Sequence, residues 1–293
     1  MGLGRTLLAM KKRFIVNADD FGLCTGVNRA IEKAHTDGIL TSTTIMAGAE
    51  GTDEALEMAR QMPSLGVGIH LNLVEGRALC QNRQAGCILD ENGEFRYSAG
   101  KIALKSMICP SARKAIENEL AAQIESLLEK GLKPTHFDSH KHVHTFPSIY
   151  KIVVRLARRF GVGAVRWPCE SLKTCSSGWP LPSKNGKRRT RIIRTMARIN
   201  RLQDNSLIKN DAFYGIAHTG KADDEFWRAV CKNAETEVAE VMTHPGYLQG
   251  LDPAKTRLID ERVVELEALC SESTKKAIAD SGVELIHYGN DKC

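Results

Sequence analysis

The sequence predicts an α/β fold, a distorted TIM-like β/α barrel of about seven strands, and three observations support it. Short runs rich in β-branched residues alternate with segments whose apolar residues recur at helical spacing. Polar clusters directly follow several strands, and parallel α/β folds build their active sites at these strand ends. The first strand runs into Asp19-Asp20 and not into Gly-x-Gly-x-x-Gly, so a dinucleotide-binding domain is not favoured.

Strands are predicted from alternation and from β-branched composition. Within residues 66–73, Val67, Ile69 and Leu71 alternate with smaller or polar side chains, which is the period of a strand. Residues 40–46 are rich in Thr and Ile, which favours a strand there as well. The predicted strands cover residues 14–16, 40–46, 66–73, 134–139, 164–167, 238–243 and 283–287.

Helices are predicted where apolar residues recur every three or four positions. Val27, Ala30, Ile31 and Ala34 follow this spacing, and Gly38 ends the first helix. The further predicted helices cover residues 53–62, 112–130, 148–160, 223–233 and 258–281, with a basic helix at 184–201.

Length and composition suit one large domain. The chain has 293 residues, of which 42% are hydrophobic and 26% charged, and this balance supports a packed core. We expect a flexible segment over residues 1–12 and a single barrel domain over 13–293. Within this domain, 76–110 is expected to be irregular and 170–210 to be a divergent basic insertion. No window approaches the roughly 20 apolar residues of a membrane span.

The net charge of +6 is concentrated in the predicted basic helix, residues 184–201. A nucleic-acid partner is not expected, because aromatic residues make up only 5% of the chain and none lies in this stretch. Two interpretations stay open for this helix: a solvated face over the barrel, or a weak contact with an anionic membrane surface.

The cysteines indicate a reducing, cytoplasmic setting. There are nine, which is an odd number, and their spacing is irregular without any Cys-x-x-Cys. A disulfide framework and a zinc-thiolate site are therefore not expected.

Asp19 and Asp20 form the first candidate site, at the end of the first strand. Adjacent carboxylates in such a place point in different directions, so one can bind a cation while the other acts on a water molecule. The alternative is a solvated turn in which the aspartates cap the following helix.

Histidines supply the second group of candidates. His70 lies on the less apolar side of the strand at 66–73, and four of the nine histidines lie within residues 136–144. Neutral imidazole is a common ligand of zinc-like ions, and Asp138 is placed to orient a neighbouring imidazole. The alternatives are a satisfied core histidine at position 70 and a His-rich surface tract at 136–144.

Two further residues follow predicted strands. Arg166 stands near the end of the predicted strand at 164–167. An arginine there can hold a carboxylate ionised by lowering the pKa of that carboxylate. His244 follows the strand at 238–243 and is fixed by Pro245 and Gly246, which suits a general acid.

These motifs resemble those of the YdjC-like family, which includes chitooligosaccharide deacetylases and a hopanoid-biosynthesis-associated branch. The matching pieces are NADDFG, VNRAIEKAHTDGILTSTTIMAG, GIHLNL, THFDSHKHVHTFP and HPGY. The resemblance implies a distorted β/α barrel, a homodimer, and hydrolysis of acetyl groups from N-acetylated sugars.

The resemblance also implies roles for individual residues. A divalent ion, Mg²⁺ or Zn²⁺, would be held by Asp20, His70 and His140. By analogy with the wider group of polysaccharide deacetylases, Asp19 would be the base and His244 the acid, with Arg166 steadying Asp19. The alternatives are another metal-dependent amidohydrolase or phosphoesterase on the same scaffold, and a non-catalytic member that binds a glycan.

Overall fold

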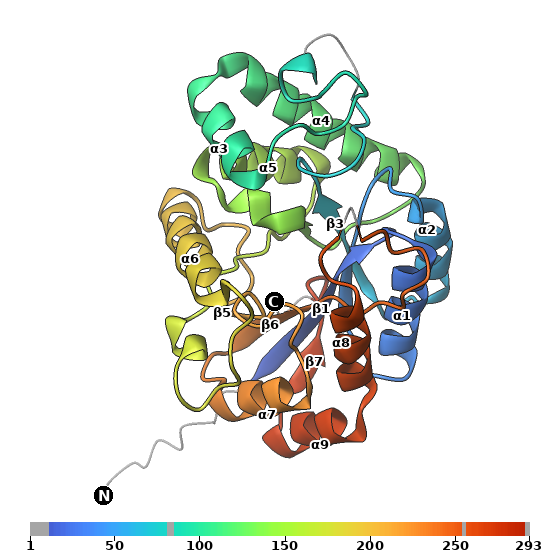
Figure 1. The fold of residues 1–293 in the computed structure, drawn as a ribbon, viewed down its shortest axis with the longest axis vertical. Coiled ribbons are helices and arrows are strands. Elements are labelled where there is room, and N and C mark those ends of the chain that lie inside the picture. Colours follow the sequence, from blue (N-terminus) through green and yellow to red (C-terminus); the bar gives the residue numbers. More distant parts are fainter. Residues whose placement is uncertain (1–11, 81–84, 254–255, 291–293) are drawn as a thin grey trace, which may run out of the picture.

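The computed structural model describes residues 12–80, 85–253 and 256–290, and one parallel β-sheet forms its centre (Figure 1). The strands follow the order β4-β3-β2-β1-β6-β5, and β7 pairs with the first residues of β1. Most of the predicted flexible segment, residues 1–12, lies outside the described residues. The strands are β1 (Arg13–Phe21), β2 (Ser42–Ile45), β3 (Gly66–Leu71), β4 (Phe137–Ser139), β5 (Ala212–Tyr214), β6 (Val238–Thr243) and β7 (Glu284–Ile286).

The sheet curls toward a barrel, and irregular backbone continues its wall between β4 and β5. Val165 forms a parallel bridge with Phe137 of β4, and its N–H donates to the carbonyl of Leu207 at 2.8 Å. The side chain of Asn210 accepts from the N–H of Trp167 and donates to the carbonyl of the same residue. This arrangement confirms the predicted distorted β/α barrel.

Three segments of the chain differ from the prediction. The prediction of a regular strand at 164–167 is wrong, because this segment forms an isolated bridge at Val165 and no regular strand. The sequence did not predict β5, which has three residues and pairs with β6. Helix α3 (Ala99–Ile108) lies within the segment 76–110 that was expected to be irregular.

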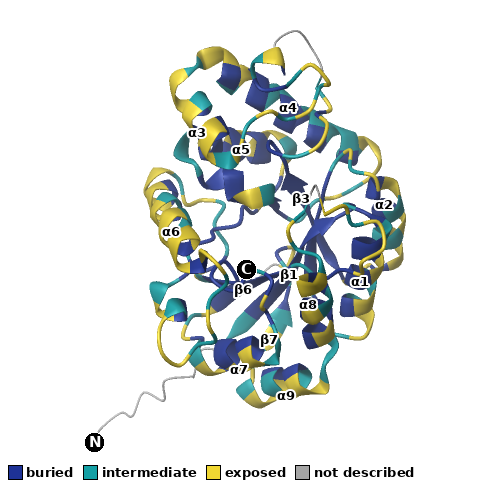
Figure 2. Ribbon diagram, viewed as in Figure 1, coloured by how far each residue is buried: buried dark blue, intermediate teal, exposed yellow. Residues whose placement is uncertain are grey.

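Helices surround the sheet and bury the sides that face it, as the dark blue inner faces show in Figure 2. Helix α5 begins at Pro147 and ends before Gly161, which has a φ of 71° that favours glycine. No helix in the described part of the chain is long and apolar enough to cross a membrane. The remaining elements are α1 (Thr25–Thr36), α2 (Thr52–Gln61), α4 (Pro110–Glu129), α5 (Pro147–Phe160), α6 (Gly186–Gln203), α7 (Asp224–Asn233), α8 (Asp260–Cys270), α9 (Glu272–Ser281), and the 3-10 helices η1 (Ala85–Cys87), η2 (His140–Thr145) and η3 (Leu172–Cys175).

The central strands are covered on both faces. Every residue of β2, β3 and β6 is buried, as expected for parallel strands between helices and a barrel interior. Polar side chains on these strands must therefore find partners inside the protein, because burial without a hydrogen bond costs free energy. Thr44, His70 and Glu240 are such residues, and they belong to the cluster described below.

Glu170 is a buried carboxyl group away from that cluster. One of its oxygens accepts from the N–H of Ala217 at 2.9 Å, while the other has no hydrogen-bond partner among the residues that the structure describes. Burial raises the pKa of Glu170 from 4.5 to about 7, although the hydrogen bond from Ala217 opposes the increase. The folded protein therefore keeps this proton over a range in which the unfolded chain has released it.

Glu170→Gln is expected to flatten the pH dependence of stability. For the native residue, the free energy of unfolding falls as pH rises from 4.5 to about 7, because ionisation is easier in the unfolded chain. Ionisation of Glu170 should lower the free energy of unfolding by about 2–3 kcal/mol between pH 5 and pH 8, and the variant should not show this decrease. Urea unfolding at both pH values measures it, with the exposed Glu272→Gln as control. Parallel pH profiles of Glu170→Gln and the native protein would contradict the prediction.

Candidate functional site

The two aspartates lie in an irregularity of β1. In the pairing with β2, Ala18 faces Thr43 and Phe21 faces Ile45, so two aspartates stand opposite one residue. Asp20 has a φ of 70°, a left-handed conformation that is rare for residues other than glycine. A bulge of this kind redirects side chains. The adjacent carboxylates therefore enter two different groups of side chains, as predicted.

Asp20, His70 and His140 come together at the carboxyl ends of β1, β3 and β4. The Oδ1 atom of Asp20 lies 3.4 Å from Nε2 of His70 and 3.1 Å from Nδ1 of His140. One ligand atom from each residue lies within 4.8 Å of the others. The three predicted metal ligands therefore present a carboxylate oxygen and two ring nitrogens toward one another.

The other nitrogen of each imidazole contacts a second carboxylate. His70 Nδ1 lies 2.7 Å from Asp138, and His140 Nε2 lies 2.7 Å from Glu75. In metal sites, a ligating histidine usually donates its second N–H to such a carboxylate, which fixes its tautomer and orientation. The donor set therefore fits a divalent cation held by Asp20, His70 Nε2 and His140 Nδ1.

The electrostatics of the imidazoles agree with this arrangement. Burial alone would lower the pKa of His140, but Asp20 and Glu75 raise it to about 9. Burial would also lower the pKa of His70, and Asp138 raises it above its usual value. The carboxylates thus favour positive charge at this point, and a cation bound there would replace the protons.

Asp19 belongs to a separate group centred on Arg166. The guanidinium donates to both oxygens of Asp19, at 2.6 and 2.8 Å, and also contacts Asp138 and Glu240 at 2.8 and 2.7 Å. Burial would raise the pKa of Asp19, but Arg166 outweighs it and holds this pKa below its usual value. Asp19 is therefore ionised near neutral pH, and the predicted pairing of Arg166 with a carboxylate is present.

A second set of possible ligands, Asp19, His70 and Asp138, is also close enough to share an ion. The guanidinium of Arg166 already contacts the carboxylates of Asp19 and Asp138. Both oxygens of Asp19 accept from Arg166, whereas Oδ1 of Asp20 accepts from no arginine among the described residues and faces the imidazoles. We therefore assign the candidate metal position to the set that contains Asp20.

His244 lies directly after β6, on the same side of the sheet. Its backbone N–H donates to Glu265 at 2.6 Å, and its Nδ1 atom, which has no hydrogen-bond partner among the described residues, lies 3.8 Å from the same carboxylate. The imidazole is close enough to Asp19 to lower the pKa of that carboxylate, and its side chain is 11% exposed. The structure thus places the imidazole of His244 between the carboxylate of Glu265 and the neighbourhood of Asp19.

The other histidines of the 136–144 tract do not join the candidate metal ligands. His136 stacks on Tyr288 with ring centroids 4.0 Å apart. His144 bonds to Ser139, and His142 lies edge-on to Phe213. Only His140 reaches Asp20, because it begins η2 immediately after β4.

Arg262 on α8 is a site residue that the sequence analysis missed. Its Nη2 atom donates to Oδ2 of Asp20 at 2.6 Å, which leaves Oδ1 facing the imidazoles. Gly246 makes room for it, because a Cβ atom there would lie 2.8 Å from Arg262 Cδ. A signal existed in the sequence: Arg262 and Glu265 share the buried face of α8 with Leu266 and Leu269, at helical spacing.

Arg262→Gln is expected to weaken binding of a divalent ion by about 10–100-fold, the usual effect of losing a residue that orients a ligand. Removing a nearby positive charge would by itself strengthen metal binding, so the sign of the change separates orientation from charge. Isothermal titration with Zn²⁺ measures the affinity, with thermal unfolding as a check of folding and the exposed Arg228→Gln on α7 as control. Tighter binding by Arg262→Gln would contradict an orienting role.

The fold and the cluster define an α/β-barrel protein with a candidate metal centre at the carboxyl end of its sheet. The family model of the YdjC-like proteins matches residues 13–280, and the chain belongs to this family. A carbohydrate deacetylase of Geobacillus stearothermophilus is 34% identical over 279 residues, covering 95% of this chain and 98% of the relative. A chitooligosaccharide deacetylase of Proteus mirabilis is 30% identical over 284 residues, with the same coverage of both chains.

A solved structure agrees with the family and with the fold. An Enterococcus faecalis protein, whose name refers to cleavage of cellobiose-phosphate, superimposes with a TM-score of 0.73. It is 25% identical in sequence, and the match covers 95% of this chain and 98% of that one. The same fold therefore extends over nearly the whole of both chains.

Proposed function

We propose that the protein is a metal-dependent hydrolase that removes acetyl groups from N-acetylated sugars. The observation that carries the proposal is the pair of neighbouring groups at the sheet edge. One of them, Asp20 with His70 and His140, fits a cation, and the other holds an ionised Asp19 on Arg166. The names of the carbohydrate and chitooligosaccharide deacetylases among its relatives support the substrate class.

The proposed cofactor is one divalent ion, Mg²⁺ or Zn²⁺. Two imidazoles and a carboxylate suit Zn²⁺ at least as well as Mg²⁺, which prefers oxygen ligands. When bound, such an ion polarises a carbonyl group and lowers the pKa of water. Asp138 and Glu75 keep the imidazoles oriented, and Arg262 keeps one oxygen of Asp20 turned toward them.

In the proposed reaction, Asp19 and His244 move the protons. Asp19 accepts a proton from the water that attacks the acetamide carbonyl carbon. Arg166 holds both oxygens of Asp19 in place during this step. His244 donates a proton to the leaving nitrogen as the carbon–nitrogen bond breaks. The products are acetate and a free amino sugar.

Acetate release from N-acetylglucosamine oligomers, with each divalent ion in turn, tests the proposal. We expect turnover by the native protein, and loss of both bound metal and turnover in His70→Ala and His140→Ala. Phosphate release from generic phosphate esters without acetate release would favour a phosphoesterase. Tight sugar binding without turnover under any ion would favour a non-catalytic glycan-binding protein.

The remaining predictions concern the setting of the protein. We propose a homodimer, a cytoplasmic location and a single barrel domain over residues 13–293, with 170–210 as a divergent insertion. The described cysteines carry free thiols, which supports a reducing compartment. The predicted insertion contains η3 and α6, and α6 packs against η2, which carries His140.

A further inference from the structure

The charges of the protein are distributed very unevenly among its helices. Helices α3, α5 and α6 carry two, four and seven Lys or Arg residues, thirteen in all, and none of the three carries Asp or Glu. The whole chain has 41 basic and 35 acidic residues, so the rest of it is net acidic. The excess of positive over negative charge is therefore carried by these three helices.

These three helices are neighbours in space. Helix α5 packs against both α3 and α6, and all three lie on the same side of the molecule in Figure 1. We call their combined exposed surface the basic face. It is larger than the basic helix that the sequence predicted, because α3 and α5 extend it.

Few acidic residues neutralise the basic face. Three arginines of α5 pair with acidic neighbours: Arg155 with Glu117, Arg158 with Asp204, and Arg159 with Glu125. Within the described part of the chain, the Lys and Arg side chains of α3 and α6 form no ion pair with a carboxylate. Arg189 and Arg194 donate to backbone carbonyls and Arg201 lies over the Trp167 ring, and none of these contacts neutralises the charge.

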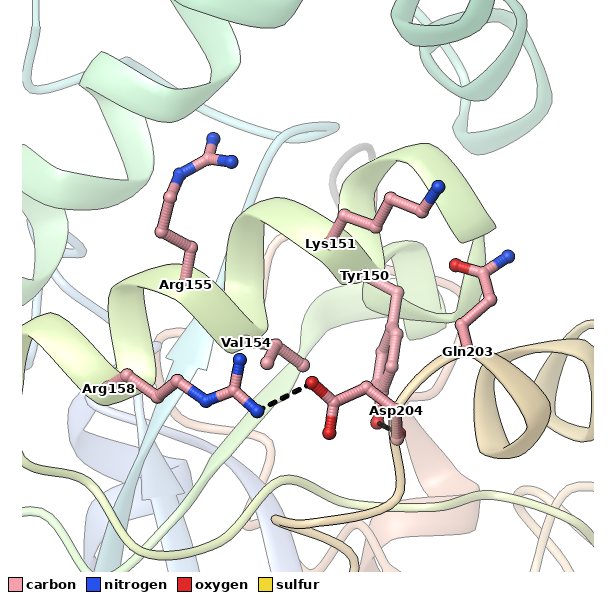
Figure 3. Close-up of a pocket in the computed structure, with 7 residues that line it drawn as sticks. All are labelled: Tyr150, Lys151, Val154, Arg155, Arg158, Gln203 and Asp204. Carbon is pink, nitrogen blue, oxygen red and sulfur yellow. Dashed lines mark hydrogen bonds and ion pairs between the residues drawn. The ribbon is translucent and has the colours of Figure 1, made fainter.

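The basic face also contains hollows lined by cations. Figure 3 shows Lys151, Arg155 and Arg158 of α5 around a depression of about 370 Å³ that extends to Gln203 and Asp204, at the end of α6. Lys151 and Arg155 also line a second depression, of about 480 Å³, between α4 and α5. Lys151 is common to both, and the arginines beside it pair with Asp204 in the first depression and Glu117 in the second.

Exposed apolar side chains lie on the same helices. Of the eleven large hydrophobic residues that are exposed in the described part of the chain, six belong to α3 or α6. Met107 and Ile108 of α3 are 63% and 68% exposed, and Leu202 of α6 is 89% exposed. None of the six is aromatic. Aliphatic side chains among basic ones are typical of helices that lie in a membrane interface.

We propose that the basic face docks the protein on an anionic phospholipid bilayer. Its positive charge complements acidic head groups, and the aliphatic side chains of α3 and α6 insert among the lipids. Single-stranded nucleic acid fits less well, because it calls for aromatic side chains on which bases stack. A second copy of this chain fits poorly as well, since two such faces repel each other.

Docking in this way brings the candidate metal centre close to the lipid surface. The segment η2, which begins with His140, packs against α3, α5 and α6. Only this one layer of helices therefore separates the segment from the basic face. The proposal does not depend on the deacetylase activity, because it concerns where the protein is held and not which bond it cleaves.

Co-sedimentation of the full chain with vesicles tests the proposal. One set contains phosphatidylcholine alone, and the other equal parts of phosphatidylcholine and phosphatidylglycerol. We expect binding only to the anionic set, decreasing as salt is added. The triple variant Lys187→Gln, Arg191→Gln, Arg198→Gln should bind about a hundredfold more weakly, at about fivefold for each cation removed. Leu202→Ser should weaken binding without changing its salt dependence.

A matched control removes the same charge elsewhere. The variant Arg228→Gln, Lys275→Gln, Lys276→Gln alters exposed or half-buried cations of α7 and α9, which pack on each other away from the basic face in Figure 1. It should bind vesicles as the native protein does. Equal weakening by both triple variants, equal binding to neutral vesicles, or retention by DNA but not by vesicles would overturn the proposal. The proposal would also be overturned if the native protein bound no vesicles and instead formed a dimer that the α6 triple variant dissociates.

Discussion

Replacing Asp19 with asparagine is expected to reduce acetate release by about a thousandfold or more while leaving the bound metal in place. Asparagine cannot accept the proton that the carboxylate takes from water, and a general base commonly contributes 10²–10⁴-fold. Metal content should not change, because Asp19 is held by Arg166 and the candidate ligand is Asp20. Turnover and elemental analysis of one preparation measure both effects.

Two comparisons make this test specific. Asp37→Asn removes an exposed carboxylate that pairs with Lys33, and it should change neither turnover nor metal content. His70→Ala should lose metal and turnover together. If Asp19→Asn lost its metal, Asp19 would be a ligand and not the base.

The second large effect is expected from Arg166→Gln, on stability. The guanidinium lies between Asp19, Asp138 and Glu240 and is fully buried. Its loss leaves three buried carboxyl groups facing one another, and breaking a buried ion pair from one side typically costs about 3–5 kcal/mol. The variant should unfold at a correspondingly lower urea concentration.

An exposed arginine provides the matched control for this loss. Arg155 pairs with Glu117 at 3.0 Å while remaining 57% exposed, so Arg155→Gln should cost less than about 1 kcal/mol. Similar unfolding midpoints for the two variants would show that the buried cluster does not depend on Arg166.

The sequence predicted elements that have regular patterns and clear ends. β6 has the predicted bounds, Val238–Thr243, because a β-branched apolar run stops at His244-Pro245. Helix α5 has a buried apolar face between Pro147 and Gly161. In both, the local pattern and the packing require the same structure.

Two elements lacked such patterns. Helix α3 was missed because Leu104, Met107 and Ile108 are exposed, so its apolar residues do not form a single buried stripe. Strand β5 has three residues and exists through its pairing with β6, and so few residues cannot establish a period of two. Tertiary contacts determine both.

The candidate site shows the same division. Asp19, Asp20, His70, His140 and His244 stand at or near strand ends, and the carboxyl ends of parallel strands meet at one edge. Arg262 reaches Asp20 from a helix 242 positions away in the sequence, and this contact depends on how α8 docks. Spacing along the chain carries no information on such a distance.

A metal-loaded crystal structure, with the ion located by its anomalous scattering, tests the central claim most directly. We expect one divalent ion bonded to Oδ1 of Asp20, Nε2 of His70 and Nδ1 of His140, with Asp19 still on Arg166. An ion bonded to Asp19 and Asp138, or imidazoles of His70 and His140 that bind no ion, would contradict it.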